Sequence, residues 1–345
     1  MKKFLLLTLP LILIAFTLFG CKSEKSFSSF SYFSCETVIK VKDADGNFDV
    51  FINECESVLT NISTNFSVKL GELKAINDAS TQTDIEISKA LYQTLLECKN
   101  LNALTFNKFN PAIYPLVKLW KFSPDNFVFN DQTFTPPSEN EIANLLVNTD
   151  FSTLSLTEKN SKYYATKTTD IKIDLGAVAK GVAVEKLSEL FSKYNYKDGY
   201  ISLGTSAIKV FGENSVLLRN PRSNDIKTVL NIKLNDKAIS TSGDYERYHI
   251  YNGKRYSHLI DSLTGYPTDT GIISATIISN DAVKADALTT ALCTMTLQDA
   301  ISFIKTNLSN ETVFIIYENE NGLTIYTNKT SGYTLTDNSV NLEII

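Results

Sequence analysis

The hydrophobic and polar positions of the first hundred residues predict a hairpin followed by helices. The segment ETVIKVKD at 36–43 alternates as a half-buried strand does, and DADGN at 43–47 is typical of the turn after it. Residues 50–62 and 84–100 instead space their apolar side chains three or four positions apart, which predicts helices. In the second helix this spacing rests on Ile85, Ala90, Leu91 and Leu95.

The middle of the chain predicts a loop, a helix and short strands. Three prolines interrupt FNPAIYPLVKLWKFSPDN at 109–126, so we expect a loop there, and it carries Trp120, the only tryptophan. SENEIANLLV at 138–147 places its serine three residues before a glutamate, which is a capping box and predicts the start of a helix. Short strands are expected from there to about residue 174.

A strand, a turn and a helix are predicted over IKIDLGAVAKGVAVEKLSELF at 171–191, with the turn at Asp174 to Gly176. Such a glycine turn before a helix can present amide donors to a phosphate, but it is also a common way to connect two elements. Its glycines match neither a Walker A nor a G-x-G-x-x-G motif. The residues that share one face of the helix are Ala179, Ala183, Leu187 and Leu190.

The densest polar stretch is AISTSGDYERYHIYNGKRYSHLIDSLTGYP at 238–267. Ser240 to Gly243 supply hydroxyl and amide donors that we expect at a turn, and RYSHLID alternates like a strand with Tyr256 and His258 on one face. Asp261 to Gly265 is typical of a further turn. Each piece also has a purely structural interpretation, because serine-rich turns often satisfy their own backbone and a single strand histidine is often structural.

The segment KADALTTAL at 284–292 predicts a helix with two different faces. Asp286 and Thr290 are four residues apart and share one face, while Leu288, Leu292 and Met295 form an apolar face. A carboxylate and a hydroxyl are hard oxygen ligands of the kind that Mg²⁺ accepts. The alternative is structural, with Asp286 capping the helix and Thr290 bonded back to a carbonyl of the preceding turn.

Composition and charge argue against several classes of protein and of site. The chain has 345 residues, 43% of them hydrophobic, which is enough for a large core, and its formal net charge is −5. We find no basic stripe, so no nucleic acid partner is expected. Beyond Cys21, the sequence has Cys35, Cys55, Cys98 and Cys293 without a C-x-x-C motif, and it has only two histidines. These counts favour neither a zinc site nor a dense disulfide framework, although one bridge stays open.

The N-terminus resembles a bacterial lipoprotein signal. Lys2 and Lys3 precede an apolar run from Phe4 to Phe19, which is shorter than a membrane-spanning helix, and Gly20 and Cys21 end it. The resemblance implies cleavage before Cys21, a diacylglycerol on its thiol, and a protein exported to the periplasmic or extracytoplasmic side of a membrane. The alternative is a plain signal peptide or an anchor helix.

This N-terminal pattern implies that the chain has three parts. Residues 1–20 would be the signal peptide, 21–30 a short lipidated polar tether, and 31–345 the catalytic domain. The tether prediction rests on the serine-rich composition of SEKSFSSFS.

Four blocks of the C-terminal half resemble, in register, the signature blocks of the ApbE family of FAD:protein FMN transferases. They are DLGAVAKG at 174–181, STSGDYERY at 240–248, RYSHLIDSLTGYP at 255–267 and ADALTTAL at 285–292. The stretch 109–122 and the pair Thr37-Val38 fit as well. The resemblance implies an α+β fold of two intertwined α/β parts, with FAD bound between them and Mg²⁺ at its pyrophosphate.

The resemblance also implies roles for individual residues. Asp286 and His258 would be catalytic, and the Mg²⁺ ligands would be the side chains of Asp286 and Thr290 and the carbonyl of Ala177. The residues implied to contact FAD are Asp174, Lys180, His258, Trp120, Lys121 and Phe122, the aromatic rings forming a wall against a flat ring, with Ser240, Thr241 and Gly243 bordering the phosphates.

The implied reaction transfers FMN from FAD to a threonine or serine of another exported protein through a phosphoester, and AMP leaves. In the family such acceptors include subunits of Rnf-type complexes and sodium-pumping quinone reductases. Two alternatives are a Mg²⁺-dependent FAD pyrophosphatase that yields FMN and AMP, and a non-catalytic FAD-binding lipoprotein. DTGIISAT at 269–276 comes near an acceptor motif, but its pattern favours a turn and a strand.

Three departures from the family pattern concern adenine and flavin contacts more than metal ligands. Gly204-Thr205-Ser206 stands where the family has G-G-N, and Cys35-Glu36-Thr37 stands where it has M-G-T. The position that often holds a tyrosine falls at Asn65 or Phe66.

Overall fold

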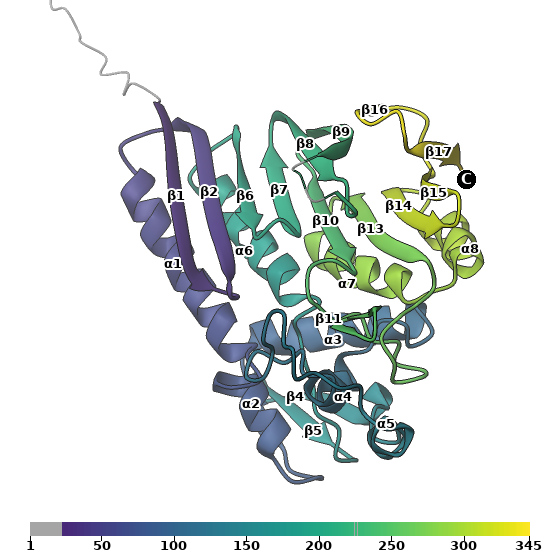
Figure 1. Ribbon diagram of the computed structural model, residues 1–345. Coiled ribbons are helices and arrows are strands. Elements are labelled where there is room, and N and C mark those ends of the chain that lie inside the picture. The colour runs from purple at the N-terminus through teal and green to yellow at the C-terminus, as the bar shows by residue number, and fades with distance from the viewer. Residues whose placement is uncertain (1–22, 224, 226) are drawn as a thin grey trace, which may run out of the picture.

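The computed structural model describes residues 23–345 except 224 and 226, and it is built on one nine-stranded sheet (Figure 1). Neighbouring strands run antiparallel except β15 and β17, which are parallel. In spatial order the sheet contains β1 (Ser23–Tyr32), β2 (Cys35–Ala44), β6 (Gly199–Leu203), β7 (Ala207–Phe211), β10 (Ala238–Gly243), β13 (Ile272–Ser279), β14 (Thr312–Asn319), β15 (Gly322–Thr327) and β17 (Asn341–Ile344).

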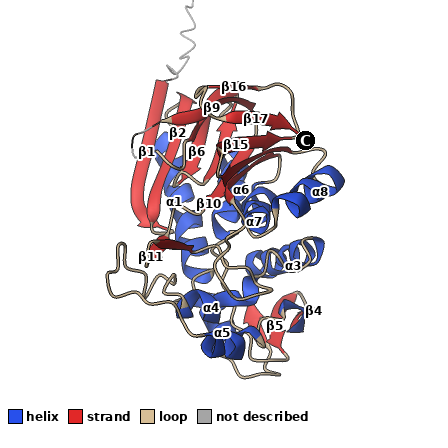
Figure 2. Ribbon diagram, turned by 45° about the vertical axis from the view of Figure 1, so that its right-hand side comes forward, coloured by secondary structure: helices blue, strands red, loops and turns tan. Residues whose placement is uncertain are grey.

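Helices cover one face of this sheet and a small sheet covers the other (Figure 2). The helical layer is α1 (Phe48–Asn65), α6 (Ala179–Lys193), α7 (Ala282–Cys293) and α8 (Leu297–Asn307). The opposite layer is β8 (Glu213–Arg219), β9 (Thr228–Asn235) and β16 (Tyr333–Leu335). Side chains of β13 alternate between the two cores, so Ala275 and Ile277 face the helices while Ile278 faces the small sheet.

A second part of the fold lies below the sheet in Figure 1 and is built from excursions of the same chain. Its elements are α2 (Gly71–Asp78), β3 (Ile85–Ile87), α3 (Lys89–Leu104), α4 (Tyr114–Leu119), α5 (Glu139–Leu146), β4 (Leu154–Lys159), β5 (Lys162–Lys167) and the hairpin of β11 (Tyr248–Tyr251) and β12 (Lys254–Ser257). Short 3₁₀ turns, Pro111–Ile113 and Phe151–Thr153, precede α4 and β4. The chain therefore enters this part twice, and the predicted α+β fold of intertwined parts is confirmed.

Several local predictions are confirmed. Residues 36–43 lie in β2, and Ser138 and Glu141 form the capping box at the start of α5. The turn after Asp261 is closed by Gly265, whose N–H donates to the Asp261 carbonyl at 2.7 Å. Residues 272–276 of the segment that resembles an acceptor motif lie in β13, where Thr276 is fully buried.

The predicted tether is wrong, because residues 23–32 form β1 at the edge of the large sheet. Lys25, Phe27 and Ser29 alternate inward between exposed neighbours and pair with β2, so this serine-rich segment has the period of a strand. The folded part thus begins before residue 31. The expected signal peptide and Cys21 lie outside the described residues.

The structure differs from three other predictions, and hydrogen bonds of the backbone and the positions of the prolines explain the differences. The helix expected over 84–100 begins only at Lys89, because Ser88 caps it and β3 pairs with β5 before it. The stretch 109–122 contains a 3₁₀ turn and α4, since its prolines stand in the first turns, where no backbone donor is needed. Residues 171–175 form no strand; both backbone groups of Ile173 bond to the side chain of Asn77.

Ser240 to Gly243 also differ from the prediction, because they form the end of β10 rather than a turn. A serine-rich segment has weak strand propensity, but β10 is held on both sides by β7 and β13. His258 lies one residue beyond β12 and not within the expected strand.

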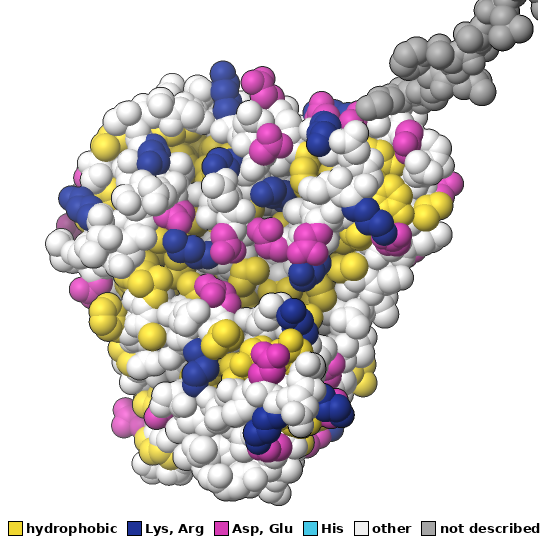
Figure 3. Space-filling model, turned by 180° about the vertical axis from the view of Figure 1, so that it is seen from behind, with side chains coloured by type: hydrophobic (Ala, Val, Ile, Leu, Met, Phe, Trp, Pro, Cys, Tyr) yellow, Lys and Arg dark blue, Asp and Glu magenta, His cyan; other side chains and the backbone are white. Residues whose placement is uncertain are grey.

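No helix in residues 23–345, with 224 and 226 left aside, is both long and apolar enough to cross a bilayer. Figure 3, seen from behind, shows lysine and arginine side chains interspersed with aspartate and glutamate on that face rather than gathered apart from them.

Candidate active site

The candidate site begins where the N-terminal ends of α6 and α7 meet. Gly181 in α6 makes this approach possible, because a Cβ there would lie 2.5 Å from the carbonyl oxygen of Ala282 in α7. The same Gly181 donates its backbone N–H to Oδ2 of Asp286 at 3.0 Å. One glycine therefore sets both the helix spacing and the orientation of the carboxylate.

Asp286 is a buried carboxylate without a salt bridge in the described part of the chain. Its residue is 5% exposed, and burial raises its pKa from 3.8 to about 6, against the opposing effects of Lys180 and the Gly181 N–H. A buried carboxylate of this kind is stabilised by a cation. Among the described residues Lys180 acts on it through its charge, but no lysine or arginine forms a direct ion pair with it.

Thr290 lies one helical turn after Asp286, as predicted. Its hydroxyl is 3.3 Å from the hydroxyl of Ser242 in β10, whereas its neighbour Thr289 donates to the Asp286 carbonyl at 2.8 Å. The helix N-cap is Asp281, whose carboxylate accepts from the Lys284 N–H. The capping interpretation of Asp286 and Thr290 is therefore wrong; Asp281 and Thr289 have those roles.

The third proposed ligand, Ala177, lies in the turn that leads into α6. Asp174 orders this turn, because its Oδ1 accepts the Gly176 N–H at 2.7 Å. The predicted donor set is the carboxylate of Asp286, the hydroxyl of Thr290 and the main-chain carbonyl of Ala177. No group of three histidine, cysteine or acidic residues in the described part of the chain could form a softer site. Such oxygen donors fit Mg²⁺, which keeps part of its coordination shell for substrate.

His258 is held in one tautomer by the backbone. Its N–H and its Nδ1 both lie against the carbonyl of Arg247, at 3.0 and 3.1 Å. A carbonyl only accepts, so Nδ1 carries the proton and Nε2 keeps a lone pair. Burial lowers the pKa of His258 well below 6.5, and the positive charges of Arg247 and Lys180 lower it further. The imidazole is therefore neutral and able to accept a proton at Nε2.

Arg247 is a residue to which the sequence analysis gave no role. Its charge interacts with that of Asp174, and its Nη1 donates to the Phe122 carbonyl at 3.3 Å. Burial raises the pKa of Asp174, while the Gly176 N–H and Arg247 lower it. In the sequence, Arg247 stands out only as an arginine among aromatic residues. Its place in the site depends on contacts with segments that are distant in the chain.

Lys180 connects the parts of the site electrostatically. Its ammonium contacts the hydroxyl of Ser206, and its charge acts on Asp286, on His258 and on Cys35. Ser206 belongs to the unusual Gly204-Thr205-Ser206 turn, in which Gly204 has a φ of +63° and packs against Cys35. Two of the departures from the family pattern, at Cys35 and at Ser206, thus meet at Lys180.

The predicted aromatic wall has a different place in the structure. Trp120 and Phe122 are fully buried in a separate core cluster, where Trp120 Nε1 donates to the Gly265 carbonyl at 2.9 Å and Phe122 stacks on His249. Lys121 between them has a φ of +59°. The two rings therefore pack the interior, and a contact of Trp120, Lys121 and Phe122 with FAD stays a prediction.

The residues of β10 divide between the two faces of the sheet. The hydroxyl of Ser242 contacts the hydroxyl of Thr289 in α7. Ser240, two residues earlier, lies on the same face of the sheet, and its buried hydroxyl has no hydrogen-bond partner among the described residues. Thr241 points to the opposite face, where its hydroxyl lies 2.9 Å from that of Thr276. Because strand residues alternate, the Thr241 side chain faces away from α7, and the predicted place of Ser240, Thr241 and Gly243 beside the phosphates stays a prediction. Gly243 is covered by the ring of Tyr245.

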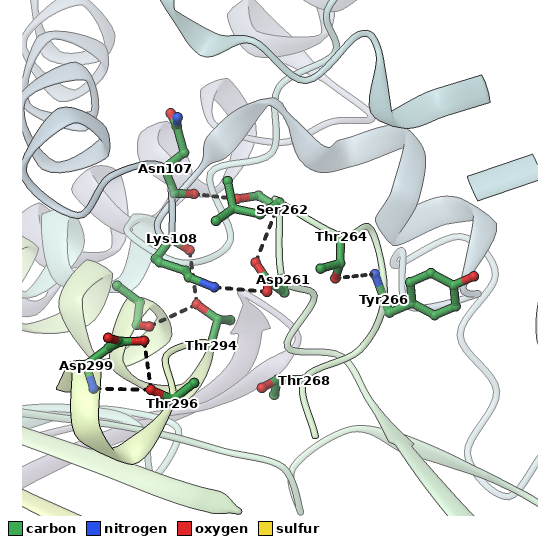
Figure 4. A network of polar contacts seen from close by, with 12 residues as sticks. Asn107, Lys108, Asp261, Ser262, Thr264, Tyr266, Thr268, Thr294, Thr296 and Asp299 are labelled. Atoms are coloured by element: carbon green, nitrogen blue, oxygen red, sulfur yellow. Dashed lines mark hydrogen bonds and ion pairs between the residues drawn. The ribbon is translucent and has the colours of Figure 1, made fainter. Parts of the chain in front are cut away.

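A polar network fixes α7 relative to the loop that follows His258 (Figure 4). Lys108 bonds Asp261 at 2.9 Å, and its carbonyl accepts from the Thr294 hydroxyl at 3.4 Å. Thr268 donates to the carbonyl of Cys293, the last residue of α7, at 2.9 Å. At the site itself, the charge of Lys180 acts on both Asp286 and His258, and the charge of Arg247 acts on both His258 and Asp174.

Known proteins resemble this chain in sequence and in fold. A protein of Haemophilus influenzae named FAD:protein FMN transferase is 28% identical over 326 residues, which cover 90% of this chain and 92% of the relative. The structure of an ApbE protein from Thermotoga maritima has a TM-score of 0.75 at 27% identity and covers 86% of this chain and 95% of that chain. The flavin transferase ApbE from Vibrio cholerae shares the fold, with a TM-score of 0.76 at 23% identity over 89% of this chain and 97% of that chain.

The family model described as the ApbE family matches residues 34–315, from the turn before β2 into β14. This range contains every element that contributes to the α6–α7 junction and to the loop of His258. The chain therefore belongs to the ApbE family.

Proposed function

We propose that this chain is a Mg²⁺-dependent FAD:protein FMN transferase, which attaches FMN through a phosphoester to a threonine or serine and releases AMP. The observation that carries the proposal is the buried carboxylate of Asp286, which forms no direct ion pair among the described residues and lies one helical turn from the hydroxyl of Thr290. The names of the relatives supply the substrate class. A carrier of FAD would have no need of such a carboxylate, which burial destabilises in the metal-free protein.

The protein's own part begins with positioning. Asp286, Thr290 and the carbonyl of Ala177 would hold Mg²⁺, which supplies positive charge at the pyrophosphate of FAD. The Gly181 N–H holds one carboxylate oxygen of Asp286 and leaves the other for this purpose. Lys180 adds a fixed positive charge beside the same group. Phosphoryl transfer depends mainly on such positioning and charge neutralisation.

In the chemical step, the acceptor hydroxyl oxygen forms a bond to the FMN phosphorus, and the bond from this phosphorus to the oxygen of the AMP phosphate breaks. The electron pair of that bond leaves with AMP. We assign the hydroxyl proton to Nε2 of His258, because the Arg247 carbonyl fixes the proton already on the ring at Nδ1. Burial keeps this imidazole neutral at physiological pH, as a base must be.

We further propose that the acceptor is an exported redox protein, such as a subunit of an Rnf-type or sodium-pumping quinone reductase complex. The N-terminal pattern ending at Cys21 supports a lipid-anchored location outside the cytoplasm, where such an acceptor would be reached.

The test is to incubate the chain from Lys22 onward with FAD and Mg²⁺, with and without the purified exported domain of an Rnf-type subunit. AMP release and covalent flavin fluorescence on a denaturing gel are followed together. AMP with a fluorescent acceptor supports the transferase. AMP without any labelled acceptor would replace it with the pyrophosphatase, and bound FAD without AMP would leave only the carrier.

A further inference from the structure

A cleft of about 450 Å³ lies where β10 ends and β13 begins, outside the candidate active site. It is lined by the segment 268–273 before and within β13, by the end of β12, and by side chains from the β8–β9 loop and β14. Neither Asp286 nor His258 lines it. Its volume is in the range of pockets that hold small ligands or short peptide segments.

The charges that line the cleft compensate one another. Arg222 binds both carboxylate oxygens of Asp244 at 2.8 Å and also binds Glu318 at 2.7 Å. Lys254 pairs with Asp269 at 2.8 Å, and Arg255 lies 3.5 Å from Asp244. Three cations thus face three anions, so the cleft offers neither the excess positive charge that a phosphate needs nor the excess negative charge that a metal ion needs.

Two neutral hydroxyls of the cleft lack a hydrogen-bond partner in the described part of the chain. They are the Ser257 Oγ and the Thr270 Oγ1, and Ser257 is only 2% exposed. Nη1 of Arg255, which also lines the cleft, likewise has no hydrogen-bond acceptor among the described residues, although it lies 3.5 Å from Asp244. A buried hydroxyl without a partner costs free energy, and it can both donate and accept. The ligand that satisfies such pairs is one that carries neutral donors and acceptors side by side, as a peptide backbone does.

The cleft adjoins the active site along three segments. Ser257 directly precedes His258, and Asp244 is two residues from Ser242, a distance of about 7 Å along an extended chain. Thr268, which also lines the cleft, bonds to the last residue of α7. A polypeptide in the cleft would therefore lie beside the segment that carries the histidine that we assign as the base.

We propose that this cleft binds an extended segment of the acceptor protein beside the hydroxyl that receives FMN. This inference rests on the proposed transferase function and names the surface that selects its protein substrate. The hydroxyls of Ser257 and Thr270 bond the main chain of the segment, and the paired charges at the rim contact its polar side chains.

The test replaces Thr270, one of the residues that line the cleft, with tryptophan, whose larger side chain would occupy part of the cleft. The matched control is Ser155→Trp on β4, an exposed strand position in the second part of the fold. Two quantities are measured for each variant: KM for the exported domain of the Rnf-type subunit, and Kd for FAD from the Mg²⁺-dependent quenching of flavin fluorescence.

We expect Thr270→Trp to raise KM for the acceptor at least tenfold and to leave Kd for FAD within twofold, while the control changes neither. Lys254→Glu, a rim change on a half-exposed side chain, should raise KM severalfold and covers the case in which the tryptophan variant does not fold. An unchanged KM in both variants, with transfer intact, overturns the cleft assignment alone. Absence of transfer by the wild-type chain overturns the proposed function and this inference with it.

Discussion

Replacing Gly181 with alanine tests whether the contact of α6 and α7 builds the site. The added Cβ would lie 2.5 Å from the Ala282 oxygen and 2.9 Å from the Val283 Cα, and real Cβ contacts essentially never fall below 3.0 Å. The two helices must therefore separate by about 0.5 Å or more. Overpacking costs about 1–3 kcal/mol, and alanine regains about 1 kcal/mol of helix propensity, so the net loss of stability is about 0–2 kcal/mol.

The effect on activity should be larger than the effect on stability. Gly181 bonds Asp286, and the turn of Ala177 leads directly into the same helix, so separation moves two candidate ligand positions apart. Because a misplacement of about 1 Å can cost about 100-fold in rate, we expect transfer to fall about tenfold or more while the protein stays folded.

The assay compares kcat for FMN transfer and the free energy of unfolding in urea for Gly181→Ala with those of a matched variant. Gly46→Ala is the control, because no atom lies within 4 Å of the Cβ that it adds. A Gly181→Ala protein with wild-type transfer rate, or one that is more stable by about 1 kcal/mol, would refute the reasoning that this glycine sets the geometry.

Three further predictions concern residues whose places the structure defines. Trp120→Ala should lower the free energy of unfolding in urea by about 3–5 kcal/mol, because its ring is fully buried; a loss below about 1 kcal/mol would contradict that packing. Thr241→Val should leave kcat for transfer within twofold, since its side chain bonds Thr276 on the far face of the sheet; a tenfold loss would place it at the site after all. His258 has a lowered pKa, so the unfolded chain binds its proton more readily, and stability present above pH 6.5 is lost as the pH falls toward the folded pKa. His258→Gln should therefore make the free energy of unfolding, measured by urea denaturation, less dependent on pH below 6.5, and an unchanged slope would contradict a neutral imidazole with a lowered pKa.

Local geometry explains why part of the site could be predicted from the sequence. Asp286 and Thr290 are four residues apart on one helix, so their common face follows from the period of the helix alone. The turn of Asp174 and Gly176 is likewise closed within three residues. Such features depend on short-range geometry, which a sequence specifies directly.

The missed features depend on contacts between distant segments. Arg247 gains its role from Asp174 and from the loop of Phe122, more than 70 and 120 residues away, and nothing local indicates either contact. The same holds for β10, a serine-rich segment that becomes a central strand because β7 and β13 pair with it. In both cases tertiary contacts override weak local preference.

The burial of Trp120 was missed for a related reason. An aromatic side chain in a proline-rich stretch suits an exposed ligand surface as well as a small separate core. The interior position of Trp120 depends on the Gly265 carbonyl, which accepts a hydrogen bond from the indole N–H, and on the rings of Phe134 and Tyr256, which pack beside it.

The most direct test of the account is AMP release from FAD, measured as a function of Mg²⁺ concentration for the wild-type chain and for Asp286→Ala, with the acceptor present. The account predicts that the wild-type rate rises with Mg²⁺ to a plateau, and that the folded variant loses at least a thousandfold of that rate at every concentration. A folded Asp286→Ala protein that releases AMP at the wild-type rate, with the same Mg²⁺ dependence, would contradict the assignment of the site.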